Sequence, residues 1–315
     1  MPADFGLGDL PAPPIWSRPA ADWPHRALYD RIIDAIYALP GLFESPLSIA
    51  GVRVSDLHTL NTTLGASIEQ SVVENLNALR KIWDPAGQYE LYSFVRQPQS
   101  FPDVRLQTSA PGAAEAILLG IELKGWFALA KEAEPSFRYK VTPNACATPD
   151  LLVVFPWVLS EVVSGTPRLL EPFVTGARYA AEHRNYYWQY TRGVVGPGAA
   201  ITSAVHQEPY PPRGKKISDV AVQDSGNNFG RVARGNFMSE FIERLIQQQL
   251  AGIPLGAWQG FFKMFTEAGP KGDVSRQIAR IKASYRDDIA GGHDAFEIFR
   301  GAVLDLADLA ERLHK

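Results

Sequence analysis

Residues 117–125 of the chain read Ile117-Leu118-Leu119-Gly120-Ile121-Glu122-Leu123-Lys124-Gly125. It is an apolar run of strand type that ends in two opposite charges, one residue apart. Side chains of a strand alternate between its two faces, so Glu122 and Lys124 project to the same side. The apolar residues around them leave little polar surface on either face, which predicts a central strand. A carboxylate in such a strand needs a cation, and Lys124 and a metal ion both qualify.

A second segment lies just upstream and reads Phe101-Pro102-Asp103-Val104-Arg105-Leu106. It places Asp103 directly after a proline, at the start of a strand expected over residues 104–107. If this strand neighbours the first one, Asp103 joins Glu122 and Lys124 at one edge of the sheet. Two carboxylates suit Mg²⁺, which takes few carboxylates and keeps several waters. The ammonium could hold or deprotonate an attacking water, or stabilise charge on a phosphate. In the alternative interpretation, Glu122 and Lys124 are an ordinary solvated pair.

Elements further out follow from the spacing of apolar residues. We expect helices over residues 26–39, 67–83, 171–190, 237–250, 258–266, 274–285 and 295–313, with a capping box at Ser67 and Gln70. We expect strands over residues 89–95, 104–107, 116–123, 151–159 and 217–222. The pattern predicts an α/β (mixed α+β) fold, in which helices flank a central mixed sheet and the C-terminal part is helical. Residues 1–25 read as an extended arm, 26–165 as the core, and 166–315 as a helical and loop-rich part continuous with it.

Composition sets limits on function. The chain has 315 residues, a net charge of -3 and one cysteine, Cys146. A disulfide within the chain and a thiolate metal cluster are therefore excluded, and DNA binding must rest on local basic patches. The apolar run 151–159 is about half the length that spans a bilayer, and the N-terminus does not resemble a secretory signal. We expect a soluble, cytoplasmic protein with no membrane association. P-loop, dinucleotide-binding and hydrolase-elbow motifs do not occur.

Pro102-Asp103 followed by Glu122-Leu123-Lys124 resembles the signature of the PD-(D/E)xK nuclease superfamily, which includes many type II restriction endonucleases. The resemblance covers roughly residues 60 to 160. It implies a restriction-endonuclease-like core, and Mg²⁺ (with Mn²⁺ as a substitute) bound by Asp103 and Glu122. It also implies phosphodiester hydrolysis that leaves 5′-phosphates, and a homodimer suited to a palindromic site. Asp103, Glu122 and Lys124 match the three motif positions. Members often carry a further acid on a preceding helix, for which Glu69 is the first candidate and Glu74 the second.

A nuclease must also bind phosphates and bases, and the loop-rich segment 184–235 holds the residue types suited to both. Arginine pairs well with guanine, and asparagine with adenine, in the major groove. The predicted DNA-binding residues are Arg184, Asn185, Arg192, Arg213, Lys215, Lys216, Asn227, Asn228, Arg231 and Arg234. The alternative is that the aromatic residues around 186–188 belong to the core or a dimer contact, and that the lysines belong to a solvated loop. We interpret a second Pro-Asp pair, Pro149-Asp150, as the entry to a strand.

Together these features favour a sequence-specific double-strand DNA endonuclease of the type II restriction kind. Two alternatives stay open. One is a structure-specific nuclease of the same fold that acts in DNA repair or recombination. The other is a DNA-binding protein without catalytic activity, in which Asp103, Glu122 and Lys124 form a structural ion pair. Cleavage at fixed sequences separates the first two, and substitution of Glu122 or Lys124 separates both from the third.

Overall fold

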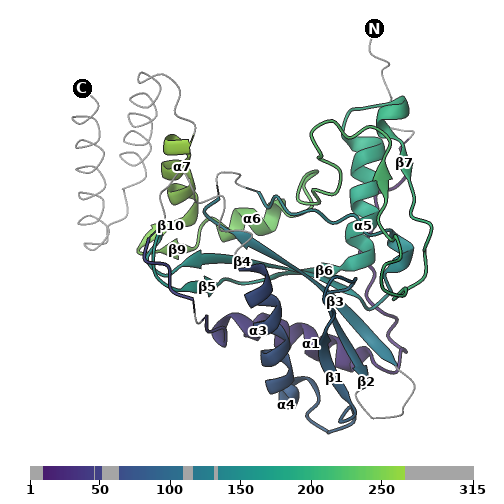
Figure 1. Ribbon diagram of the computed structural model, residues 1–315, viewed down its shortest axis with the longest axis horizontal. Coiled ribbons are helices and arrows are strands. Elements are labelled where there is room, and N and C mark those ends of the chain that lie inside the picture. Colours follow the sequence, from purple (N-terminus) through teal and green to yellow (C-terminus); the bar gives the residue numbers. More distant parts are fainter. Residues whose placement is uncertain (1–9, 46, 52–63, 109–115, 131–133, 267–315) are drawn as a thin grey trace.

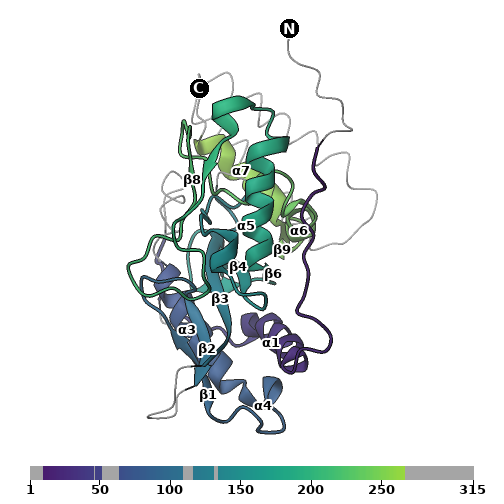
Figure 2. The same ribbon diagram turned by 90° about the vertical axis from the view of Figure 1, so that its right-hand side faces the viewer.

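The computed structural model describes residues 10–45, 47–51, 64–108, 116–130 and 134–266. The helices expected over 274–285 and 295–313 lie outside these residues. The fold is mixed α+β, as expected, with a central mixed sheet and flanking helices (Figures 1 and 2). No helix in the described part of the chain is long and apolar enough to span a membrane.

The main sheet has six strands, in the order β1-β2-β3-β4-β5 with β6 also paired to β4. The strands are β1 (Tyr92–Arg96), β2 (Val104–Thr108), β3 (Ile117–Phe127), β4 (Leu151–Leu159), β5 (Pro167–Leu169) and β6 (Phe173–Gly176). The β3–β4 pair is parallel and the other pairs are antiparallel. All nine residues of β4 are buried, as their continuous apolar run predicts. Strand β3 is central and reaches past Lys124, so both charges of the motif lie within it.

The helices are α1 (Arg26–Ala38), α3 (Gly65–Ala78), α4 (Arg80–Trp83), α5 (Ala177–Tyr186), α6 (Ser239–Leu245) and α7 (Leu255–Thr266). Shorter helical turns are η1 (Leu39–Gly41), η3 (Pro143–Ala145), the π-helical η4 (Tyr187–Thr191) and η5 (Gly196–Ala199). Two small antiparallel sheets pair β7 (Ile201–Thr202) with β8 (Val220–Ala221), and β9 (Gln249–Leu250) with β10 (Ile253–Pro254).

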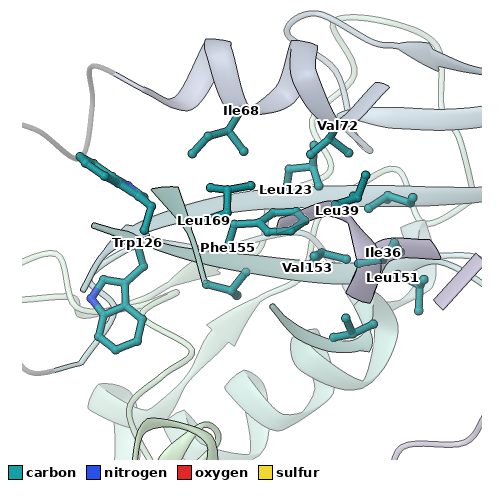
Figure 3. Close-up of a cluster of buried hydrophobic side chains, with 14 of the residues drawn as sticks. Ile36, Leu39, Ile68, Val72, Leu123, Trp126, Leu151, Val153, Phe155 and Leu169 are labelled. Carbon is teal, nitrogen blue, oxygen red and sulfur yellow. The ribbon is translucent and has the colours of Figure 1, made fainter. Parts of the chain in front are cut away.

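Two apolar layers cover the sheet. On one face, Ile68 and Val72 of α3 point toward the sheet residues Leu123 and Phe155 (Figure 3). On the other face, Leu152 packs in a cluster with alanines of α5. Because β3 side chains alternate, Leu123 faces the α3 layer whereas Glu122 and Lys124 face the α5 layer. Glu122 and Lys124, the predicted catalytic residues of β3, therefore lie on the face opposite α3.

Several expected boundaries differ from the structure. The first part of the expected helix 171–190 is strand β6, because Val174 and Thr175, both β-branched, pair with β4. The capping box at Ser67 was wrong: α3 begins at Gly65, so Ser67 lies inside the first turn. The expected strand 217–222 is regular only at Val220–Ala221, and the expected helix 237–250 is reduced to α6 and ends in β9.

Candidate active site

The β2–β3 register brings the motif residues together. Val104 lies opposite Ile121, so Asp103, one residue before β2, lies beside Glu122 on the same face of the sheet. Pro102, which follows a cis peptide bond, packs directly on Gly120. A Cβ atom on Gly120 would come within 2.3 Å of Pro102 Cγ. Glycine at this position therefore permits the close approach that seats Asp103 at the edge of β3.

Two short hydrogen bonds hold the three predicted catalytic side chains on β3: Asp103 bonds to the backbone of the strand, and Lys124 bonds to Glu122. The Leu123 N–H donates to Asp103 Oδ2 at 2.7 Å, and Lys124 Nζ donates to Glu122 Oε1 at 2.6 Å. Glu122 is buried, at 8% exposure, and Lys124 is half-buried. Two carboxylates and one ammonium thus share one face at the junction of β2 and β3, as the alternation of side chains predicted.

At this junction the single ammonium of Lys124 does not balance the two carboxylates of Asp103 and Glu122. Burial, with the neighbouring charge of Glu122, raises the pKa of Asp103 to about 8, although Lys124 opposes this rise. Burial lowers the pKa of Lys124, but the negative charges of Glu122 and Asp103 outweigh it and raise that pKa overall. Lys124 therefore stays an ammonium at neutral pH, and a cation bound beside Asp103 would lower the raised pKa of that carboxyl.

Asp103 and Glu122 open into a pocket of about 400 Å³. Its other walls come from two loops, one before Asp103 and one near residue 213. The lining residues are Gln99, Ser100, Phe101, Asp103, Glu122, Val141, Pro211, Pro212, Arg213, Gly214, Lys215, Ile217 and Ser218. Arg213 donates to the Gln99 side chain at 3.1 Å, which joins the two loops. Two carboxylates, Asp103 and Glu122, and two cationic residues, Arg213 and Lys215, thus line one pocket.

Asp103 and Glu122 fit a hard divalent cation that keeps most of its waters. Within the described ranges no three His, Cys, Asp or Glu side chains gather as a ligand set, so the pocket offers two carboxylates, Asp103 and Glu122. Mg²⁺ is commonly held in this way, by one or two carboxylates with water completing its octahedron. A second positive charge would also offset the repulsion that raises the pKa of Asp103.

Glu69, the predicted fourth catalytic residue, lies on α3 and makes an ion pair with Arg96 of β1. Arg96 Nη2 and Nε donate to Glu69 Oε2 at 2.7 and 3.0 Å. Arg96 lies opposite Val104 and so shares the α3 face of the sheet, whereas Glu122 projects from the other face. The charge of Glu69 raises the pKa of Asp103 slightly. Glu74 is exposed on the same helix.

Arg184 does not lie at the surface, which corrects its prediction as a DNA-binding residue. Its guanidinium donates to the carbonyls of Tyr139 and Val141 and to the carboxylate of Asp219. The Arg184 and Asp219 side chains are 2% and 0% exposed. Asn185 accepts hydrogen bonds from Arg184 and donates to Asp219. This buried pair tethers α5 to two loops and has a structural role.

Most of the other predicted DNA-binding residues contact the protein itself. Arg192 stacks on Trp188 at 3.3 Å and donates to the Gly198 carbonyl. Asn227 accepts from Arg138 and Lys140. Asn228 accepts from Arg234, which also pairs with Glu134, and Arg231 is half-buried. Residues 213–216 form a basic loop at the surface. Its cationic residues Arg213, Lys215 and Lys216 are exposed, and the first two line the pocket.

Sequence reasoning missed three residues behind the pocket. Asp150, interpreted as strand-entry chemistry, is completely buried and accepts a hydrogen bond from Tyr210. The Arg105 guanidinium lies 5.3 Å from the centre of the Tyr210 ring. The Pro149-Asp150 pair before an apolar strand could have marked Asp150 as a residue of interest. Its partner Tyr210 lies 60 residues away in the chain and could not be predicted from the sequence.

No protein-family model, curated protein or solved structure matches this chain.

Proposed function

We propose that the protein is a Mg²⁺-dependent endonuclease that hydrolyses phosphodiester bonds of double-stranded DNA, at specific sequences as type II restriction enzymes do. The observation that carries this proposal is the pocket itself. Asp103 and Glu122 line it together with Arg213 and Lys215, and Lys124 donates a hydrogen bond to Glu122. Carboxylates for a metal and cations for phosphate oxygens thus meet in one open pocket.

Each side chain has a distinct part in this proposal. Asp103 and Glu122 would hold Mg²⁺, which supplies charge neutralisation and an activated water. Lys124 is kept protonated by the two carboxylates, so it is suited to orienting the attacking water or stabilising negative charge on the phosphate, rather than to removing a proton. Arg213 and Lys215 are placed to bind the substrate's phosphates. A homodimer on a two-fold symmetric site is part of the same proposal.

The proposal is tested by digesting unmethylated DNA of known sequence with the purified protein and Mg²⁺ or Mn²⁺, and sequencing the ends. Fixed ends that carry 5′-phosphates are expected. Ends that depend on branches or flaps would instead indicate a structure-specific repair or recombination nuclease. Intact DNA under both metals would overturn the enzymatic proposal and leave a non-catalytic DNA-binding protein.

A metal-binding measurement tests the two carboxylates of the pocket independently of cleavage. Because burial and Glu122 raise the pKa of Asp103 to about 8, Mg²⁺ binding is expected to release protons at pH 7. Calorimetric titration in two buffers of different ionisation enthalpy measures this release. Asp103→Asn should abolish it, whereas Glu161→Gln, a change in an exposed turn, should not.

A further inference from the structure

A buried carboxylate behind the pocket connects the catalytic strand to the basic loop. Asp150 is 0% exposed. Its Oδ1 accepts from the Gly120 N–H at 2.7 Å and from the Tyr210 hydroxyl at 2.5 Å, and its Oδ2 accepts from the Ala147 N–H at 2.7 Å. Gly120 lies two residues before Glu122 in β3. One side chain therefore ties the strand that carries the motif to a loop ninety residues further along the chain.

Tyr210 is held from two sides. Its hydroxyl donates to Asp150, and its ring lies against the Arg105 guanidinium, which in turn donates to the Phe101 carbonyl at 3.1 Å. Its backbone has φ of +54°, a left-handed conformation that a tyrosine keeps only where surrounding contacts impose it. The position of the chain at residue 210 is thus set by contacts with the segments around Asp103 and Glu122.

The residues directly after Tyr210 form the basic wall of the pocket. Pro211, Pro212, Arg213 and Lys215 all line it. The two prolines restrict the backbone between the anchor and the cations, so a shift of Tyr210 is carried to Arg213. Both cations are exposed, and long exposed side chains bind a phosphate well only when their backbone is already in place.

We propose that Tyr210 is a positioning residue, whose hydroxyl bond to Asp150 holds residues 211–215 over Asp103 and Glu122 so that Arg213 binds the phosphate of the DNA substrate. This inference rests on the proposed function. A phosphate that approaches two carboxylates is repelled unless cations are fixed on its other side. The Asp150–Tyr210 hydrogen bond would hold the loop that carries these cations in place.

A double-mutant cycle tests the coupling between Tyr210 and Arg213. Tyr210→Phe, Arg213→Ala and the double variant are compared with wild type by kcat/KM on a short duplex that contains a site mapped in the digestion. Tyr210→Phe removes only the hydroxyl and keeps the ring on Arg105. Each single change is expected to lower kcat/KM about tenfold. The double variant should be no worse than about tenfold, because Arg213 is already misplaced without the hydroxyl.

Tyr89→Phe is the matched control. The Tyr89 hydroxyl bonds to His25 Nδ1 at 2.9 Å, near the Tyr92 end of β1, whereas the pocket lies near the Arg96 end. Tyr89→Phe, like Tyr210→Phe, removes one hydroxyl from a part-buried hydrogen bond, and kcat/KM should stay at the wild-type value. A loss equal to that of Tyr210→Phe would reduce Tyr210 to a general stability role and overturn the inference.

The outcomes separate the inference from the proposed function. If wild type does not cut DNA, the proposed function fails and the role of Tyr210 fails with it. If wild type cuts but the two losses multiply to about a hundredfold, or Tyr210→Phe changes nothing, only the Tyr210 inference is overturned. Should Tyr210→Phe not fold, Asp150→Asn replaces it in the same cycle. Non-additivity then supports the inference, and additive losses overturn it.

Discussion

The ion pairs Arg184–Asp219 and Lys124–Glu122 differ in how many of their hydrogen-bonding groups have a partner. The Arg184–Asp219 pair is sealed from solvent. Arg184 also donates to the carbonyls of Tyr139 and Val141, and Asp219 also accepts from Asn185 and the Ala204 N–H. Lys124 and Glu122 are 21% and 10% exposed, and in the described part of the chain the Lys124 ammonium has only Glu122 as a hydrogen-bond partner. The first pair has no capacity left for a ligand, whereas in the second pair Glu122 lines the pocket and can take one.

The largest effect on stability is expected at the sealed pair. Arg184→Leu leaves the Asp219 carboxylate buried without its cation, which should lower the free energy of unfolding by about 3–5 kcal/mol. Chemical denaturation measures the change. Arg168→Gln, at an exposed position of β5, should change it by no more than about 0.5 kcal/mol. A loss below about 1 kcal/mol for Arg184→Leu would mean that the pair is not structural.

This contrast also explains what the sequence could predict. The strands 104–107 and 151–159 and the shared face of Glu122 and Lys124 follow from local spacing, because alternation and apolar runs are local properties. The role of Arg184 could not be predicted, because its partner Asp219 is 35 residues away and a helical arginine beside aromatics has the composition of a DNA-binding surface. Tyr210 was missed for the same reason, since its acceptor Asp150 lies 60 residues away in the chain, just before β4.

A smaller stability effect is expected from pH, through Asp150. Burial raises the pKa of this carboxyl to about 6, from 3.8. The folded protein therefore binds a proton more tightly than the unfolded chain, and this contribution to stability is lost as pH rises from about 4 to 6. The loss amounts to about 3 kcal/mol at most. Denaturation curves across this range should show it in wild type but not in Asp150→Asn. Parallel curves for the two proteins would contradict it.

Mg²⁺ should distinguish the two pairs directly. A ligand that binds only the folded protein raises its free energy of unfolding, by about 2.7 kcal/mol at a hundredfold excess over Kd. Thermal unfolding should show this rise in wild type and in Glu161→Gln, but not in Glu122→Gln, which removes one of the two predicted ligands. An equal response of Glu122→Gln would place the metal elsewhere.

The smallest effect is expected at Glu69. Its ion pair with Arg96 is partly exposed, with side chains 27% and 39% accessible, so Glu69→Gln should cost about 1 kcal/mol or less. Because this pair lies on the α3 face of the sheet, DNA cleavage should change less than about threefold. Cleavage assays check this, and a loss as large as that of Glu122→Gln would restore Glu69 to the catalytic role that the resemblance implied.

The most direct test compares DNA cleavage and thermal unfolding for wild type and Lys124→Ala. We expect cleavage with Mg²⁺ to fall by about 10²-fold or more, as expected when a group that stabilises the transition state is removed. The protein should stay folded, because Lys124 is only half-buried and Glu122 lines an open pocket. Cleavage at the wild-type rate by folded Lys124→Ala would contradict the assignment of Glu122 and Lys124 as the active site.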